Sequence, residues 1–327
     1  MSDSNTQAIL GVAQGFMESR ILLSAAELNV FTILQSRALS AEEIGATLGA
    51  DTRALSTLLD AVAAMGLLVK QDGRYRCEQP VARFLAEDSP ETVLPMVRHM
   101  ASLWPRWSRL TDAVRGIAME EFQLSRNGDD LRAFIGAMHV IGMPLAKQIA
   151  ASVNPSESQA LLDVGGGSGT YTIAFLRAVP GMKATIFDLP DVIEMARERL
   201  RDEGLLDRVT LIPGSYDDQE LPRGYDLVLL SAIIHSNNPE ENLELYKKIF
   251  RSLNPGGRLL IRDHVMEPDH TRPKDGAIFA INMLVGTSGG GTYAYKEIES
   301  ALLQAGFTQI KLLMPGAHMD AVVEARR

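Results

Sequence analysis

An acidic residue, a glycine-rich turn and a second acidic residue form the pattern in this chain that best suits chemistry on a ligand. Asp163 ends an apolar run that leads into the turn G-G-G-S-G, and Asp188 ends the next apolar run. The pattern predicts a strand, a tight turn, a helix and a second strand that closes with a carboxylate. Glycines let the backbone approach a ligand closely, and a carboxylate at that point suits the hydroxyls of a ribose. The sequence therefore predicts a nucleoside pocket.

The spacing of the glycines indicates which nucleoside is bound. Gly165, Gly167 and Gly169 form G-x-G-x-G, and Thr170 stands where a dinucleotide-binding turn has its third glycine. A dinucleotide also needs the helix N-terminus for its pyrophosphate. S-adenosylmethionine (SAM) carries no phosphate, and Asp163 can face its positively charged end. The turn favours SAM, and a plain strand-to-helix turn without a ligand is the alternative.

The composition is that of a two-domain protein with buried cores, at 327 residues and 46% hydrophobic content. The one cysteine, Cys77, excludes an intramolecular disulfide and leaves no cysteine cluster for zinc. A net charge of -9 weighs against nucleic acid and anionic membranes as partners. The polar N-terminus and the lack of a long uncharged apolar run predict a cytoplasmic enzyme.

The first hundred residues have the pattern of a winged helix. Ser40 begins a capping box, Asp51 can cap the next helix, and Asp72-Gly73 suits the turn of a hairpin. The second helix carries only Arg53 as a basic residue, so DNA binding is not expected. Helices upstream have more apolar surface than one small winged helix can cover, which predicts a homodimer. That surface includes Ile9, Val12, Phe16, Leu22, Leu23, Leu28, Phe31 and Leu34.

The C-terminal half alternates between strands and helices. Apolar runs at 209–214, 225–235 and 257–265 are separated by helical segments, and two closing strands form a hairpin. This order predicts a mostly parallel sheet, in which ligands bind at the carboxyl ends of the strands. The residues expected at those ends are Gly165, Asp188, Ser215, His235 and Asp263.

The runs L-L-D-V-G-G-G-S-G, F-D-L-P-D-V-I, I-I-H, N-P-G-G-R-L-L-I-R-D and A-G-F resemble the SAM-dependent small-molecule O-methyltransferases of the caffeic acid and acetylserotonin type. Bacterial relatives in that family methylate phenols and polyketides. The resemblance covers nearly the whole chain. It implies a class I methyltransferase, Rossmann-like, with a mostly parallel seven-stranded sheet after an α-helical winged-helix dimerisation domain. The expected division is 1–100 for dimerisation, 101–154 as a helical linker that contributes to the substrate pocket, and 155–327 for SAM binding.

The same resemblance assigns the cofactor site and the reaction. SAM is the expected donor, S-adenosylhomocysteine (SAH) the product, and a hydroxyl of a small, aromatic metabolite the acceptor. Asp188 matches the acid that binds the ribose, and Ser215 and Tyr216 fall around the adenine. Ser231 stands where plant members place a lysine near the SAM carboxylate. The full set of predicted cofactor residues is Asp163, Gly165, Gly167, Asp188, Leu189, Ser215, Tyr216 and Ser231.

His235 resembles the catalytic base of the family, with Asp263 as the acid that supports it. A phenol, with a pKa near 10, must lose its proton as its oxygen attacks the methyl group, and a neutral imidazole can accept that proton near pH 7. The family motif H-D-W is H-S-N here, and Thr292 replaces a second acid. A structural role or a contact with the cofactor is therefore an alternative for His235.

The acceptor pocket is predicted from His139, Met143, Asn282 and Met283, with Phe279 nearby. A purely structural role is the alternative for His139, and core packing is the alternative for residues 276–291. His264 follows Asp263 and is expected to face the other side of its strand. No metal is expected, because no histidine pair has the spacing of a metal-binding helix.

Two other functions are compatible with the sequence. Some relatives of this fold keep SAM but perform decarboxylation, hydroxylation or ring-forming chemistry, and methylation of carbon or nitrogen is a related possibility. A winged helix before a Rossmann-like domain is also similar to an NADH-sensing transcriptional repressor. The single basic residue on the second helix and the missing third glycine favour the enzyme.

Overall fold

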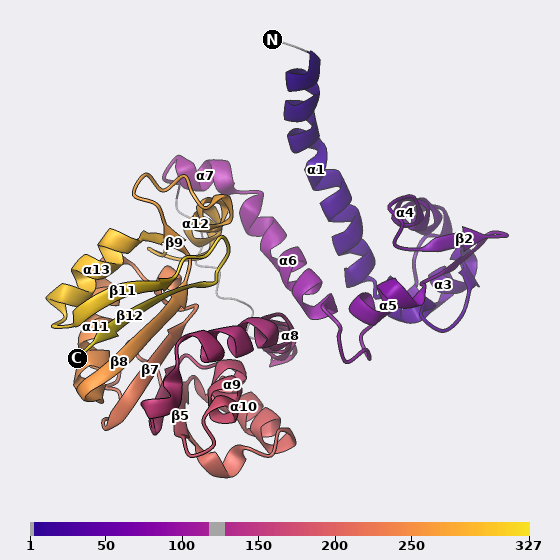
Figure 1. The fold of residues 1–327 in the computed structure, drawn as a ribbon. Coiled ribbons are helices and arrows are strands. Elements are labelled where there is room, and N and C mark those ends of the chain that lie inside the picture. The colour runs from indigo at the N-terminus through magenta and orange to yellow at the C-terminus, as the bar shows by residue number, and fades with distance from the viewer. Residues whose placement is uncertain (1–2, 118–127) are drawn as a thin grey trace. The chain divides into compact units, whose positions relative to one another are not determined.

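The structure is a computed structural model that describes residues 3–117 and 128–327. The chain forms two compact units, drawn in Figure 1. The first contains residues 1–105 and 136–140, and the second contains residues 106–135 and 141–327.

The N-terminal unit consists of short helices and a small antiparallel sheet. Its helices are α1 (Asp3–Glu27), α2 (Val30–Leu34), α3 (Ala41–Leu48), α4 (Thr52–Ala64) and α5 (Gln79–Leu85), and its strands are β1 (Leu39–Ser40), β2 (Val69–Gln71) and β3 (Arg74–Arg76). The predicted capping box starts α3, because the Ser40 side chain accepts from the Glu43 amide and Glu43 accepts from the Ser40 amide. Asp51 caps α4 as predicted, and the hairpin turns at Asp72-Gly73.

The core of the N-terminal unit is apolar, with Phe31, Leu59 and Tyr75 almost fully buried. The first half of α1 does not share in this burial. Its apolar side chains remain on the surface, and Val12 is 85% exposed. Ile9, Val12 and Phe16 recur at helical spacing and so form one apolar stripe. This stripe is one part of the surplus apolar surface that the sequence predicted. The prediction is wrong for Leu23, Phe31 and Leu34, which are buried within the unit.

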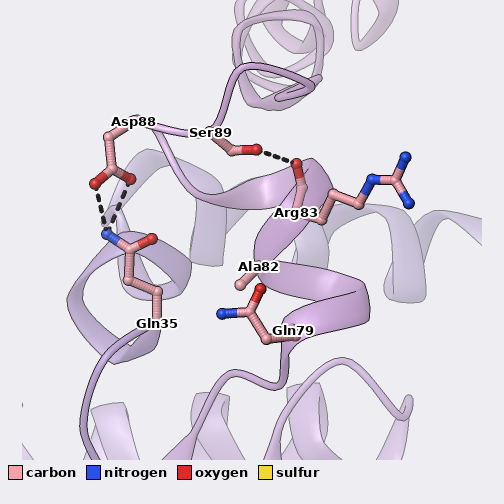
Figure 2. Close-up of a pocket in the computed structure, with 6 residues that line it drawn as sticks. All are labelled: Gln35, Gln79, Ala82, Arg83, Asp88 and Ser89. Carbon is pink, nitrogen blue, oxygen red and sulfur yellow. Dashed lines mark hydrogen bonds between the residues drawn. The ribbon is translucent and has the colours of Figure 1, made fainter.

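A hollow of about 220 Å³ lies on the N-terminal unit, beside α5 (Figure 2). Its polar groups bond to one another: Gln35 donates to both oxygens of Asp88, and the Ser89 hydroxyl donates to the Arg83 carbonyl. The Arg83 side chain pairs with Glu91. The hollow therefore offers few free polar groups to a ligand.

The second unit is built on one seven-stranded sheet in the order β11-β12-β8-β7-β4-β5-β6. Strands β4 to β8 are parallel, β12 is antiparallel to β8, and β11 is antiparallel to β12. The predicted mostly parallel sheet with a closing hairpin is confirmed. The strands are β4 (Ala160–Val164), β5 (Lys183–Asp188), β6 (Val209–Pro213), β7 (Tyr225–Ser231), β8 (Leu253–Asp263), β11 (Thr308–Met314) and β12 (Ala321–Arg326).

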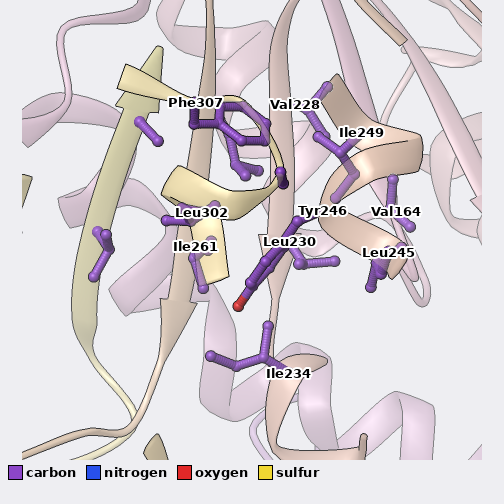
Figure 3. Packing of buried hydrophobic residues seen from close by; sticks show 14 of the residues in the cluster. Val164, Val228, Leu230, Ile234, Leu245, Tyr246, Ile249, Ile261, Leu302 and Phe307 are labelled. Atoms are coloured by element: carbon purple, nitrogen blue, oxygen red, sulfur yellow. The ribbon is translucent and has the colours of Figure 1, made fainter. Parts of the chain in front are cut away.

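Helices cover both faces of this sheet (Figure 1). On one face α11 (Pro239–Ser252) and α13 (Tyr295–Gln304) pack on β7 and β8, with Tyr246, Ile249 and Phe307 at the centre of the cluster in Figure 3. On the other face α8 (Gly128–Ser152), α9 (Thr170–Ala178) and α10 (Pro190–Asp202) cover β4 and β5. Successive side chains of each strand face opposite layers, so both faces are apolar.

Five further α-helices and strands complete the described structure outside the main sheet and its covering helices. They are α6 (Leu94–Trp107), α7 (Leu110–Val114), α12 (Lys274–Gly286), and the short parallel pair β9 (Val265–Met266) and β10 (Tyr293–Ala294). One described stretch, Phe134–Ser152 of α8, is long and apolar enough to cross a membrane. Its residues Ala146, Ile149 and Ala150 are buried against α9 and the sheet, while most of the stretch is not buried.

Candidate active site

The carboxyl ends of the parallel strands gather the predicted site residues at one edge of the sheet. Strand β4 lies between β5 and β7, and the chain leaves β4 toward β5 and reaches β7 only after β6. The strand order therefore reverses at β4 and β7, which is where open α/β sheets bind ligands. Gly165 follows β4, Asp188 ends β5, Ser215 follows β6, His235 follows β7 and Asp263 ends β8.

The glycine turn after β4 requires glycine at defined positions. Gly165 and Gly167 both have positive φ angles, of 67° and 58°. A Cβ atom at Gly165 would collide with the side chain of Ile233, whereas the space beside Gly167 is open. The turn is thus closed toward the sheet and free on the side where a ligand could approach.

Asp163 is buried beneath this turn, with only 1% of its surface exposed. One carboxylate oxygen accepts a 2.7 Å hydrogen bond from the Thr172 hydroxyl, and the other has no partner among the described residues. Burial raises the pKa of Asp163 to about 6, although the hydrogen bond from Thr172 opposes the shift. A buried acid with an unpaired oxygen fits a site for a cationic group, such as the ammonium of SAM.

Asp188 closes β5 with its carboxylate held by two backbone amides. The Gly167 amide donates at 2.8 Å and the Leu189 amide at 2.7 Å, one to each oxygen. Burial raises the pKa of Asp188, and these two hydrogen bonds lower it. Each carboxylate oxygen can accept a further hydrogen bond, so the geometry fits the two hydroxyls of a ribose.

The loop after β6 carries Ser215 and Tyr216. The Lys248 ammonium fastens it by donating to the Tyr216 carbonyl at 2.6 Å and the Asp217 carbonyl at 3.0 Å. The Ser215 hydroxyl contacts Asp217 within the loop. The half-buried ring of Tyr216 packs on the sheet core, and burial raises the pKa of its hydroxyl. Its aromatic face suits contact with an adenine.

Ser231 has an arginine for a partner, which the sequence analysis missed. Ser231 and Arg262 are neighbours on β7 and β8, and Nε of Arg262 donates to the Ser231 hydroxyl at 2.9 Å. The guanidinium also donates to the Met319 carbonyl and lies 5.1 Å from the ring centre of Tyr171. The Tyr171 hydroxyl is buried without a partner among the described residues. Arg262 thus brings a positive charge beside Ser231, and an arginine inside an apolar strand is the signal that could have revealed it.

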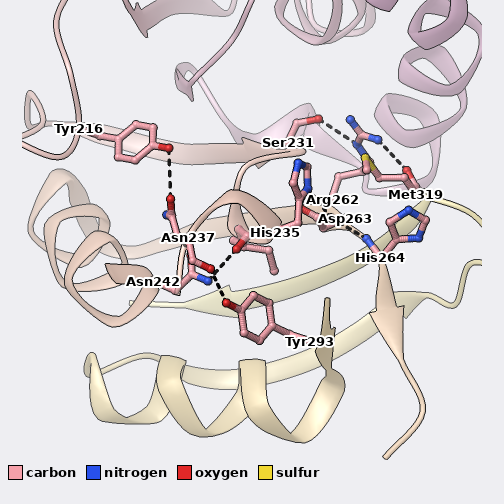
Figure 4. Close-up of polar contacts among 11 residues, drawn as sticks. Tyr216, Ser231, His235, Asn237, Asn242, Arg262, Asp263, His264, Tyr293 and Met319 are labelled. Carbon is pink, nitrogen blue, oxygen red and sulfur yellow. Dashed lines mark hydrogen bonds and ion pairs between the residues drawn. The ribbon is translucent and has the colours of Figure 1, made fainter. Parts of the chain in front are cut away.

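His235 and Asp263 form a buried pair (Figure 4). Nδ1 of His235 lies 2.9 Å from both oxygens of Asp263. Burial raises the pKa of Asp263, but the charge and hydrogen bond of His235, together with the His264 amide, hold it below the usual range. Asp263 is therefore a carboxylate near neutral pH and keeps the Nδ1 proton of His235 in place.

Helix α12 presents the predicted acceptor residues next to this pair. The Phe279 ring lies edge-on to His235, with ring centres 4.9 Å apart. Asn282 and Met283 follow Phe279 by three and four positions, so the helix places them on the same side. The Asn282 side chain accepts a 3.0 Å hydrogen bond from the Trp107 indole, and Met283 is buried.

His139 and Met143 complete the predicted set of site residues. The buried His264, just after β8, packs its ring on Phe279 with 4.9 Å between ring centres, and its place on the other side of the strand stays a prediction. His139 lies half-buried in α8, and Met143 packs on the cluster formed by α9, α10 and β5. Within residues 3–117 and 128–327, no group of three or more His, Cys, Asp or Glu is arranged to hold a metal ion.

Comparison with known proteins gives the family. An O-methyltransferase domain model matches residues 111–308, and an O-methyltransferase dimerisation domain model matches residues 10–88. The 3-hydroxy-5-methyl-1-naphthoate 3-O-methyltransferase of Streptomyces sahachiroi is 32% identical over 94% of this chain and 92% of its own. The tetracenomycin polyketide synthesis 8-O-methyl transferase TcmO of Streptomyces glaucescens is 29% identical over 93% and 91%. The solved structure of PigF with SAH, from a protein of Serratia sp., has a TM-score of 0.90 at 28% identity over the whole of both chains.

The chain belongs to the O-methyltransferase family and is a SAM-dependent O-methyltransferase of the small-molecule type. The predicted family, the class I fold with its N-terminal helical dimerisation domain, and SAM as cofactor are confirmed. Relatives named for a naphthoate and for polyketide synthesis are enzymes of secondary metabolism. Membership of this family decides against the NADH-sensing repressor.

Proposed function

We propose that this enzyme transfers the methyl group of SAM to a hydroxyl of a small aromatic metabolite, with His235 as the base that removes the hydroxyl proton. The observation that carries the proposal is the buried His235–Asp263 pair at the carboxyl edge of the sheet, with both Nδ1 to oxygen distances at 2.9 Å. Strand β7, which leads to His235, neighbours β4, which leads to the glycine turn, and Asp188 ends β5 on the other side of β4.

The chain has a suitable group for each part of SAM. Asp188 would hold the ribose, with Leu189 beside it and Tyr216 against the adenine. Arg262, fixed by Ser231, would pair with the carboxylate, since an arginine fork suits carboxylate geometry. The unpaired oxygen of Asp163 would face the ammonium. When bound, SAM supplies a methyl group that is already activated on a sulfonium.

Asp263 prepares His235 to act as a base. Its carboxylate accepts a hydrogen bond from Nδ1–H of His235, so the lone pair lies on Nε2. Nε2 is the nitrogen that can take a proton from an acceptor hydroxyl. After that transfer the imidazole is positive, and the adjacent carboxylate stabilises it. Because the pKa of Asp263 is lowered despite its burial, Asp263 keeps its charge throughout.

The acceptor side of the site is apolar and aromatic. Phe279 and Met283 supply apolar surface beside His235, and Asn282 can donate from its amide because its oxygen is already bonded to Trp107. Methionine adapts to irregular apolar shapes. These properties support an aromatic acceptor with a polar substituent. Met143 of α8 is proposed to contribute to the same pocket, and the role of His139 stays a prediction.

Methyl-labelled SAM tests the proposal directly. Purified protein with chelator is mixed with 3-hydroxy-1-naphthoate and simple phenols, and with the matched methoxy compounds as controls. We expect label to enter the hydroxyl compounds as a methyl ether and not the methoxy compounds. Label on carbon or nitrogen, or loss of carbon dioxide without methyl transfer, would reject O-methylation. Loss of transfer caused by the chelator would reject the metal-free mechanism.

The chain is further proposed to act as a homodimer through the N-terminal unit. The dimerisation domain model covers residues 10–88, and the exposed stripe on α1 gives a partner an apolar surface to cover. Light scattering should give the mass of two chains for the wild type, and Val12→Glu should shift the equilibrium toward one chain. A wild-type monomer at micromolar concentration would reject this proposal. Residue boundaries near 100 and 154, a cytoplasmic location and the lack of nucleic-acid or membrane partners stay predictions.

A further inference from the structure

The short turn that carries His235 is held from three directions. This 3-10 turn, Ile234–Ser236, follows β7. The Ile234 carbonyl accepts a 2.8 Å hydrogen bond from the Asn242 side chain on α11, and the His235 carbonyl accepts a 2.9 Å hydrogen bond from the Gly291 amide. Two residues after His235, the Asn237 carbonyl accepts from the Tyr293 hydroxyl. The backbone on both sides of His235 is therefore fixed by other elements.

Two asparagine side chains connect this turn to the loop of Tyr216 (Figure 4). The Tyr216 hydroxyl donates to Oδ1 of Asn237 at 3.5 Å, and Nδ2 of Asn237 donates to Oδ1 of Asn242 at 3.2 Å. Nδ2 of Asn242 then donates to the Ile234 carbonyl. Each asparagine accepts at one end and donates at the other, which a primary amide can do and a carboxylate cannot.

Both amides are buried, Asn237 with 6% and Asn242 with 3% of its surface exposed. Asn242 lies on the same face of α11 as Leu245, Tyr246 and Ile249, which pack into the apolar core. A polar group on such a face destabilises the fold unless its hydrogen bonds are made. Two such buried amides, Asn237 and Asn242, lie next to His235, which indicates that they hold this turn in place.

We infer that Tyr216, Asn237 and Asn242 form a directional hydrogen-bond relay that positions His235 and couples it to the loop that contacts the adenine. The inference rests on the proposed roles of Tyr216 and His235. Asn237 and Asn242 are positioning residues, because they act on the base through its backbone. An adenine that fixes the position of the Tyr216 ring also fixes the position of its hydroxyl. Through the two asparagines, this restricts the Ile234 carbonyl, which precedes His235. The relay stands in the place of the missing H-D-W motif.

Two variants interrupt the relay at opposite ends. Tyr216→Phe keeps the ring for the adenine and removes only the hydroxyl. In Asn242→Leu, the leucine side chain has nearly the same shape as asparagine and suits the apolar face of α11, so this variant should fold. Tyr225→Phe is the matched control. Tyr225 begins β7, and its hydroxyl donates to the hydroxyl of Thr185 on β5 and not to the turn.

The measurement is the NMR signal of the His235 ring in protein with labelled histidine, recorded with and without SAH and assigned with His235→Ala. In the wild type and in Tyr225→Phe, SAH should shift and sharpen this signal. In Tyr216→Phe and Asn242→Leu the response should fall to less than about half, while SAH still raises the midpoint of thermal unfolding. Asn242→Leu should also change the His235 signal before SAH is added.

A wild-type response of His235 in both relay variants would overturn the inference. That result is independent of the proposed function, which fails instead if His235→Ala transfers methyl groups at the wild-type rate. If the relay is correct, the kcat of both variants should fall by about 10- to 100-fold, the scale of a misplaced catalytic group. The KM for SAM should change by much less in Asn242→Leu than the kcat does.

Discussion

The two units of this chain differ in how deeply their charged and polar side chains are buried. In the N-terminal unit the core is apolar and the ion pairs lie on the surface, as in Arg83–Glu91 and Lys70–Asp60, whose side chains are 40–56% exposed. In the second unit Asp163, Asp263 and Asn242 are each at least 97% buried. Surface pairs contribute little to stability, whereas a buried polar group destabilises the fold unless it is satisfied. The buried polar groups at the carboxyl edge of the sheet therefore identify the part of the molecule that function has shaped.

A hollow in the surface does not by itself identify that part. The hollow of about 220 Å³ lies on the N-terminal unit, where its polar groups are bonded to each other. At the carboxyl edge of the second unit, an oxygen of Asp163 and the hydroxyl of Tyr171 are buried without partners among the described residues. Unpaired buried groups are expected where a ligand completes the hydrogen bonding. The chemistry of the lining distinguishes the two regions better than their shape.

The largest expected effect is on stability, at Asp163. Its pKa of about 6 in the fold lies above the ordinary value of 3.8, so the folded protein binds the proton more tightly than the unfolded chain. Its contribution is therefore most favourable below about pH 4 and is lost as the pH rises to about 6. The loss amounts to about 3 kcal/mol, since one pKa unit is about 1.4 kcal/mol. In Asp163→Asn this part of the pH dependence should disappear in urea unfolding measured without SAM. If the two proteins differ in free energy of unfolding by the same amount at about pH 4 and at about pH 6, this prediction is contradicted.

The next effect is on cofactor affinity, at Asp188. Asp188→Asn replaces a carboxylate that can accept from both ribose hydroxyls, and SAM binding should weaken by about 1.5 to 3 kcal/mol, or roughly 10- to 150-fold. Titration calorimetry measures the change. Asp202→Asn, an exposed acid at the end of α10, should bind SAM like the wild type. Wild-type affinity in a folded Asp188→Asn protein would reject the site.

A variant of Arg262 distinguishes binding of the SAM carboxylate from binding of the adenosine part. Arg262→Gln should weaken SAM by about 1.5 kcal/mol, the lower end of the scale for a hydrogen bond to a charged group. Methylthioadenosine has the adenine, ribose and sulfur of SAM but no carboxylate, so its affinity should not change. Competition calorimetry with the two ligands makes the comparison within one variant. An equal loss for both ligands would show that Arg262 acts on the fold of the site and not on the carboxylate.

The smallest effect is expected in the N-terminal unit. Arg83→Gln removes the ion pair with Glu91 at the hollow, yet the pair is exposed and screened by water. We expect no resolvable change in the midpoint of thermal unfolding or in SAM affinity. A clear loss of SAM affinity would place part of the cofactor site in the N-terminal unit and end the contrast between the two units.

The sequence predicts those features that local pattern and strand order control. The glycine turn, the capping box at Ser40 and the alternation of strands and helices each follow from neighbouring residues. The parallel sheet then brings Asp188, His235 and Asp263 to one edge, because the carboxyl ends of its strands coincide. Their roles as ligand or base remain predictions.

The rest depends on contacts between distant segments. The pairing of Ser231 with Arg262 follows from the register of β7 and β8, which no local pattern reveals. The relay through Asn242 depends on how α11 packs on β7, although an asparagine on an apolar helix face is a signal.

The most direct test of the central claim is single-turnover methyl transfer by His235→Ala, with a phenol that the wild type methylates. General-base catalysis contributes about 10²- to 10⁴-fold, so the variant should be slower by that factor near pH 7 while it binds SAM normally. The difference should shrink toward about pH 10, where the phenol ionises without help. The control is His270→Gln, an exposed histidine paired with Glu297. A variant that matches the wild type from about pH 6 to about pH 10 would contradict the account and remove His235 from the mechanism.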